Sequence, residues 1–133
     1  MATANPSLFI FHYSLKYILS ALCAVALAVL SLFPVKELHL EDMTLSDKWA
    51  HFIMYGGFMA TILFDRMYRQ RNFRMPIPIL LFPIAYGGLM ELLQAYCTNG
   101  NRSGDWLDFA ENSIGAFLVY TTALIIKSNY HKP

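Results

Sequence analysis

Charged residues are absent from long stretches of this chain, and these stretches have the length of membrane-spanning helices. The first runs from Tyr17 to Val35 without a single Asp, Glu, Lys or Arg. At a rise of 1.5 Å per residue it covers roughly the 30 Å of a bilayer core. Three further apolar stretches follow, and the pattern predicts helices over residues 15–33, 47–64, 77–96 and 106–127. Because each crossing must satisfy its own backbone hydrogen bonds in lipid, we expect an all-α fold, an integral membrane four-helix bundle.

The distribution of basic residues predicts the orientation of this bundle. No internal repeat or linker divides the chain, so residues 1–133 are expected to form a single transmembrane domain. With both termini cytoplasmic, seven of the ten Lys and Arg residues lie on the cytoplasmic side, in agreement with the positive-inside rule. A cleaved signal peptide is the alternative for the first stretch, but that stretch ends in Phe33 and Pro34 rather than in small residues. The net charge of +1 argues against nucleic acid as a partner.

Polar side chains occur within or against the apolar stretches, where each costs about 2–3 kcal/mol if it faces lipid near the bilayer centre. These residues are Asp47, His51, Tyr55, Glu91, Gln94, Asp108, Glu111 and Asn112. In the expected topology the second and fourth helices begin, and the third ends, on the external side. All of these side chains therefore fall at one level, in the outer third of the membrane, and the sequence predicts a polar pocket that opens to the outside.

Helical spacing places these residues in stripes. Asp47, His51 and Tyr55 recur at intervals of four, and Glu91 and Gln94 are three apart, so each set shares one helix face. A third stripe consists of Asp105, Asp108, Asn112 and Gly115. Purely structural roles remain open for some members, since Asp47 and Asp105 also suit helix caps. Glu91 and Asn112 fit a purely structural role least well because they need buried partners, and we expect these to be His51 and Arg102.

Three segments of the chain resemble the VanZ-like family of small membrane proteins. They are "DKWAHFIMYGG", "ELLQ" and "RSGDWLDFAENSIGA", and the resemblance covers about residues 44–120. The matching positions are Asp47, Lys48, His51, Tyr55, Glu91, Gln94, Arg102, Asp105, Asp108, Asn112 and Gly115. The resemblance implies a multi-pass protein of the bacterial inner membrane, linked to the cell envelope and in some members to reduced sensitivity to the glycopeptide teicoplanin.

Three functions are compatible with the predicted pocket, and the sequence leaves open whether the protein is an enzyme. An enzyme acting on a lipid-linked substrate would use His51, Glu91 and Asp108 as catalytic groups. The residues that would bind the ligand are Asp47, Tyr55, Gln94, Arg102, Asp105 and Asn112. Alternatively, the pocket only holds membrane lipid, a lipid-linked envelope precursor or a glycopeptide-related ligand, or its polar network only fixes helix packing.

Metal binding is the remaining chemical alternative for these residues. His51, Glu91, Asp105 and Asp108 are all competent metal ligands, but one histidine among oxygens lacks the spacing of a zinc site. The sequence therefore predicts no metal, and it identifies no cofactor.

Overall fold

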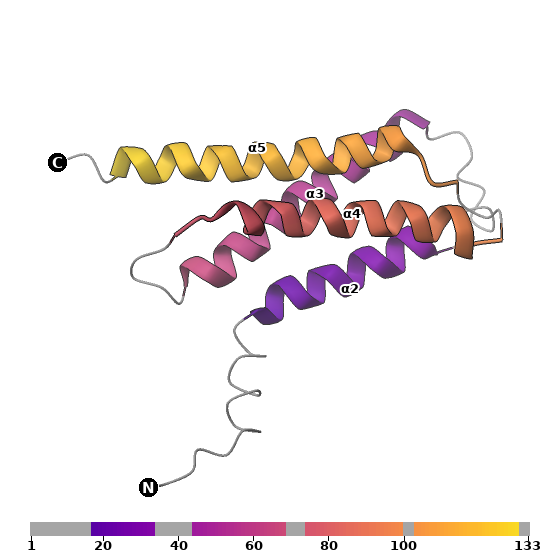
Figure 1. The fold of residues 1–133 in the computed structure, drawn as a ribbon, viewed down its shortest axis with the longest axis horizontal. Coiled ribbons are helices and arrows are strands. Elements are labelled where there is room, and N and C mark those ends of the chain that lie inside the picture. Colours follow the sequence, from indigo (N-terminus) through magenta and orange to yellow (C-terminus); the bar gives the residue numbers. More distant parts are fainter. Residues whose placement is uncertain (1–16, 34–43, 69–73, 100–102, 131–133) are drawn as a thin grey trace, which may run out of the picture.

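The computed structural model describes residues 17–33, 44–68, 74–99 and 103–130, with side chains omitted for residues 44–48 and 130. Within these ranges the chain forms four helices and no strand (Figure 1). They are α2 (Ile18–Leu32), α3 (Thr44–Met67), α4 (Ile77–Cys97) and α5 (Trp106–Tyr130). Consecutive helices run in opposite directions along an elongated bundle. The all-α prediction is thereby confirmed.

The helix boundaries differ from the sequence-based ranges mainly in α3. This helix begins at Thr44 and ends at Met67, three residues beyond the expected range at each end. Neither added segment contains Gly or Pro, so nothing in the local sequence stops the helix there. The start of α4 agrees with the prediction because Pro76 and Pro78 flank its first residue, and proline favours the first turn of a helix.

Two of the described helices have the length and composition of membrane spans. These are α4 and α5, whereas α2 is apolar but has only 15 residues. Large apolar side chains on these helices are more than half exposed, among them Leu22, Val25, Leu81, Phe82 and Ile125. Many exposed apolar side chains on helices of this length favour association with a membrane over exposure to water.

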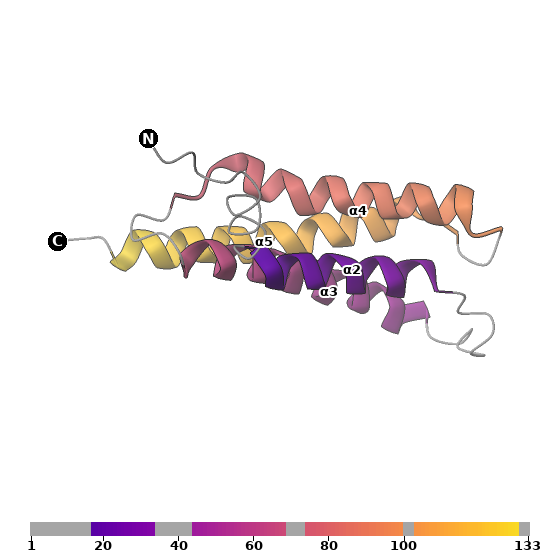
Figure 2. The same cartoon turned by 90° about the horizontal axis from the view of Figure 1, so that it is seen from below.

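The pair α3 and α5 forms the most extensive helix contact in the bundle. A side chain at Gly115 would collide with the backbone carbonyl of Phe52, and one at Gly56 would lie 3.5 Å from the carbonyl oxygen of Gly115. Helical spacing placed Gly115 in a polar stripe, but the structure uses it for close backbone packing. Helix α5 lies opposite α2 in Figure 1 and α4 lies opposite α3 in Figure 2, and α2 and α5 each pack against α3 and α4.

Helix α2 is held at both ends by buried side chains from its neighbours. At its start, Asp65 of α3 accepts hydrogen bonds from the backbone N–H of Ser20 at 2.8 Å and from the Ser20 hydroxyl at 2.7 Å. At its end, the Gln94 amide of α4 donates to the carbonyl oxygen of Ser31 at 2.8 Å. Helix ends leave backbone groups without partners inside the helix, and these contacts satisfy some of them.

Candidate functional site

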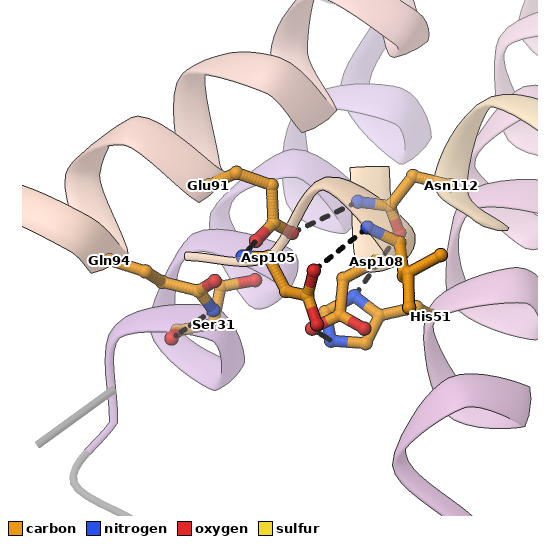
Figure 3. A network of polar contacts seen from close by, with 8 residues as sticks. Ser31, His51, Glu91, Gln94, Asp105, Asp108 and Asn112 are labelled. Carbon is orange, nitrogen blue, oxygen red and sulfur yellow. Dashed lines mark hydrogen bonds and ion pairs between the residues drawn. The ribbon is translucent and has the colours of Figure 1, made fainter. Parts of the chain in front are cut away.

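Four polar side chains from three helices meet at one end of the bundle (Figure 3). His51 comes from the beginning of α3, Glu91 from the end of α4, and Asp108 and Asn112 from the beginning of α5. His51, Glu91 and Asn112 are buried. Because consecutive helices are antiparallel, these distant parts of the sequence reach the same level. The structure thus brings His51 and Glu91 together, as the sequence predicted.

Asn112 is fully buried and bridges His51 and Glu91. Its Oδ1 lies 3.1 Å from His51 Nδ1, and its Nδ2 donates to Glu91 Oε1 at 3.3 Å. An amide oxygen can only accept a hydrogen bond, so with Asn112 Nδ2 directed to Glu91, the N–H at His51 Nδ1 donates the hydrogen bond to Asn112 Oδ1. Nε2 then lies on the opposite side of the imidazole ring, where its lone pair can accept a hydrogen bond or bind an ion.

The second oxygen of Glu91 is oriented by the loop that precedes α5. Glu91 Oε2 accepts a hydrogen bond from the backbone N–H of Asp105 at 3.1 Å. This loop packs directly on α4, because a side chain at Gly104 would collide with the backbone carbonyl of Glu91. Glycine at 104 therefore allows the close approach, and Glu91 is held by donors on both carboxylate oxygens.

Asp108 lies on the Nε2 side of the imidazole. Its Oδ2 is 3.7 Å from His51 Nε2, and its side chain is 15% exposed, compared with 3% for His51. This distance is too long for a hydrogen bond, but it permits an ion pair when the imidazole is protonated. One possible ligand atom from each of His51, Glu91 and Asp108 lies within 4.8 Å of the other two.

Gln94 and Asp105, which were predicted to bind a ligand, make hydrogen bonds within the protein. Gln94 is directed toward α2 and donates to Ser31. Asp105 caps α5, since its Oδ1 accepts a hydrogen bond from the backbone N–H of Leu107 at 3.0 Å, as expected for an N-cap residue. A direct role of either side chain in ligand binding stays a prediction.

Tyr55 lies one turn along α3 from His51 and is fully buried. A side chain at Gly87 would lie 3.1 Å from the Tyr55 ring and 3.3 Å from the Asn112 amide, so both residues pack against this glycine. The Tyr55 hydroxyl has no hydrogen-bond partner among the described residues. The other two predicted ligand-binding groups, the Asp47 side chain and Arg102, lie outside the described part of the chain.

Asp65 and its buried contact with Ser20, at the opposite end of the bundle, were not predicted from the sequence. In the sequence, Asp65 stands out only as a single acid at the end of an apolar stretch, followed by Arg66 and three further arginines. Those arginines indicated only the orientation of the bundle.

The chain was compared with protein-family models, with curated proteins and with solved structures, and none of them matches it. The likeness to the VanZ-like family therefore rests on the three sequence segments alone.

Proposed function

We propose that this chain is a VanZ-like integral membrane protein that uses the His51–Asn112–Glu91 network, together with Asp108, to bind or process a lipid-linked ligand of the cell envelope. One observation carries the proposal. Asn112 holds the imidazole and the Glu91 carboxylate in fixed orientations, beside a second carboxylate that is still partly exposed. Such an arrangement suits proton transfer or recognition of a polar headgroup.

The proposed topology has four crossings with both termini in the cytoplasm. The apolar surface of α4 and α5 supports membrane insertion, and the antiparallel order of the helices is compatible with successive crossings. Trp49 and Trp106 are 64% and 81% exposed. Each lies two residues before a member of the cluster, His51 and Asp108 respectively. Exposed tryptophan at this level is typical of a membrane–water interface. With both termini in the cytoplasm, the cluster would face the extracytoplasmic side, in the outer third of the membrane.

The chemistry of the cluster restricts its ligand. His51 Nε2 presents a lone pair that can accept a hydrogen bond from a ligand, and Glu91 presents a carboxylate with both of its oxygens already oriented. A ligand hydroxyl or ammonium group can donate hydrogen bonds to Glu91 and Asp108. A phosphate would meet two carboxylates there, so its binding requires a cation at the same place.

A structural role is the alternative, and the same amide favours it. Asn112 uses both its donor and its acceptor within the chain, which would also fix the packing of α3, α4 and α5. Interhelical hydrogen bonds in membranes contribute about 0.6 kcal/mol on average. Because this contribution is small, helix packing alone does not explain why so many polar groups are buried.

A susceptibility assay tests the proposed function. Bacteria expressing the wild-type chain are compared with cells expressing His51→Ala, Glu91→Gln or Asp108→Asn, and the readout is the inhibitory concentration of teicoplanin. We expect expression of the wild type to raise this concentration and the three variants to lose the effect at equal protein abundance. Ser128→Ala, at an exposed position near the opposite end of α5, is the control and should behave as wild type. If Glu91→Gln and His51→Ala both keep the effect, the cluster has no part in function.

A further inference from the structure

The side chains of His51, Glu91 and Asp108 form a donor set that suits a metal ion. They come from three helices, and one ligand atom of each lies within 4.8 Å of the others. We propose that these three residues bind a divalent transition-metal ion, with Zn²⁺ as the first candidate and Mn²⁺ as the second. The donor set supports such a site whichever ligand the protein binds.

The spacing of the donors fits an ion with only small side-chain movements. The centre of three atoms no more than 4.8 Å apart lies within roughly 2.8 Å of each of them, compared with about 2.0–2.2 Å for Zn²⁺ bound to imidazole or carboxylate. A shift of well under 1 Å in each side chain, about the size of an ordinary rotamer adjustment, therefore closes the site. Because the three donors lie on separate helices, the ion would also link these helices.

The groups behind the donors are arranged as in known metal sites. A metal-binding histidine almost always donates its other ring N–H to an oxygen of the protein, which fixes the tautomer and the orientation of the ring. His51 does this through Nδ1 to Asn112 Oδ1. Glu91 is oriented in the same manner by Asn112 Nδ2 and by the backbone N–H of Asp105. Asn112 therefore supports two of the three ligands at once.

Charge and ligand type indicate the class of ion. Two carboxylates balance a charge of 2+, so the occupied cluster would add little net charge to a mostly buried environment. The imidazole favours Zn²⁺, whereas Ca²⁺ and Mg²⁺ prefer oxygen ligands. The two carboxylates also suit Mn²⁺, which is therefore the second candidate. Three protein ligands leave at least one position for water or for a ligand oxygen, as in catalytic zinc sites.

Tyr55 supplies an independent indication that a group is bound here. Its hydroxyl is fully buried and has no hydrogen-bond partner among the described residues. The Tyr55 ring and the Asn112 amide both lie against Gly87 of α4, so Tyr55 borders the residue that orients two of the three ligands. A buried polar group without a partner is rare, and a water or anion on the ion would be a suitable acceptor for it.

Metal titration of the full chain tests the proposal. The protein is purified in detergent, stripped with a chelator and titrated with Zn²⁺ and with Mn²⁺ by calorimetry. The chain contains four histidines, so the comparison is made with His51→Ala, which should bind one equivalent less than the wild type. Glu91→Gln and Asp108→Asn should weaken the site at least about 100-fold. Asn112→Ala should weaken it about 10- to 100-fold, as for other residues that orient a ligand.

Two further measurements make the outcome decisive. Ser128→Ala, the control on α5, should bind Zn²⁺ as the wild type does. X-ray absorption at the zinc edge of the wild type, which needs no variant to fold, should show one imidazole nitrogen among oxygens at about 2.0–2.2 Å. Equal stoichiometry in the wild type and His51→Ala would overturn the proposal, as would binding of Ca²⁺ or Mg²⁺ without Zn²⁺ or Mn²⁺.

Discussion

The side-chain amide of Asn112 donates a hydrogen bond to Glu91 Oε1 at 3.3 Å, and thereby joins the beginning of α5 to the end of α4. The contact is buried and links residues that are 21 positions apart. The oxygen of the same amide is occupied by His51. An amide is suited to this position because it donates on one side and accepts on the other, which a carboxylate or an apolar side chain of similar size cannot do.

Replacement of Asn112 by Asp should destabilise the protein strongly. The substitution keeps the shape of the side chain but removes the donor to Glu91 and places two acids against each other. We expect the free energy of unfolding in detergent to fall by about 2–4 kcal/mol, in the range found when one partner of a buried polar pair is removed. Thermal or denaturant unfolding followed by circular dichroism measures this change.

A charge-swapped double variant is the control for this substitution. Asn112→Asp combined with Glu91→Gln restores one donor and one acceptor across the same contact, and the carboxylate introduced at position 112 would still accept from His51. The double variant should therefore be more stable than Asn112→Asp alone, with a coupling energy of about 0.5–3 kcal/mol. Additive effects of the two substitutions would show that the contact is not formed.

Gly115 should not tolerate a side chain. A methyl group there would collide with the backbone carbonyl of Phe52 on α3, so α3 and α5 would have to separate. We expect Gly115→Ala to lower the free energy of unfolding by about 1–3 kcal/mol, as overpacking does elsewhere. Gly57→Ala is the matched control because nothing lies within 4 Å of its added Cβ; it should stabilise α3 by up to about 1 kcal/mol. Equal melting temperatures for the two variants would contradict the observed packing.

The positions of the helices and the meeting of His51, Glu91 and Asn112 could be predicted from the sequence. The lengths of the apolar stretches indicate the helices, and their alternating direction determines which residues share a level. These two features need no knowledge of packing. For this reason even residues 61 positions apart, such as His51 and Asn112, could be assigned to one cluster.

The hydrogen-bond partner of each polar side chain could not be predicted in the same way. Helical periodicity shows which residues share a face, but it does not show which neighbouring helix that face meets. Gln94 shares a face with Glu91, yet the structure directs it to Ser31 on α2. The contact of Asp65 with Ser20 depends in the same way on where α2 lies against α3. The role of Gly115 could not be predicted either. Its spacing places it in line with polar residues of α5, and in the structure it allows close contact between α3 and α5.

The role of Gln94 can be separated from that of its neighbour Glu91. If Gln94 serves to hold the end of α2, Gln94→Leu should leave the Ser31 carbonyl without this donor and loosen the last turn of α2. Hydrogen exchange followed by mass spectrometry should then show faster exchange in the last turn of α2, with the amides of α5 unchanged. The teicoplanin and zinc measurements should be close to those of the wild type. If Gln94→Leu instead abolishes the teicoplanin effect or zinc binding while hydrogen exchange in α2 stays unchanged, Gln94 takes part in ligand binding.

The membrane orientation of the bundle can be read from a native side chain. Cys97 is exposed at the end of α4, near the cluster, whereas Cys23 is partly buried within α2. In the proposed topology a membrane-impermeant maleimide added to intact cells should label Cys97, and Cys97→Ser should abolish this labelling.

Tyr68 is exposed just beyond the end of α3, at the opposite end of the bundle. Tyr68→Cys in the Cys97→Ser background should be labelled only after the membrane is permeabilised. Because the cluster and Cys97 share one end of the bundle, labelling of residue 68 but not residue 97 in intact cells would place the cluster on the cytoplasmic side and exclude a ligand in the outer leaflet.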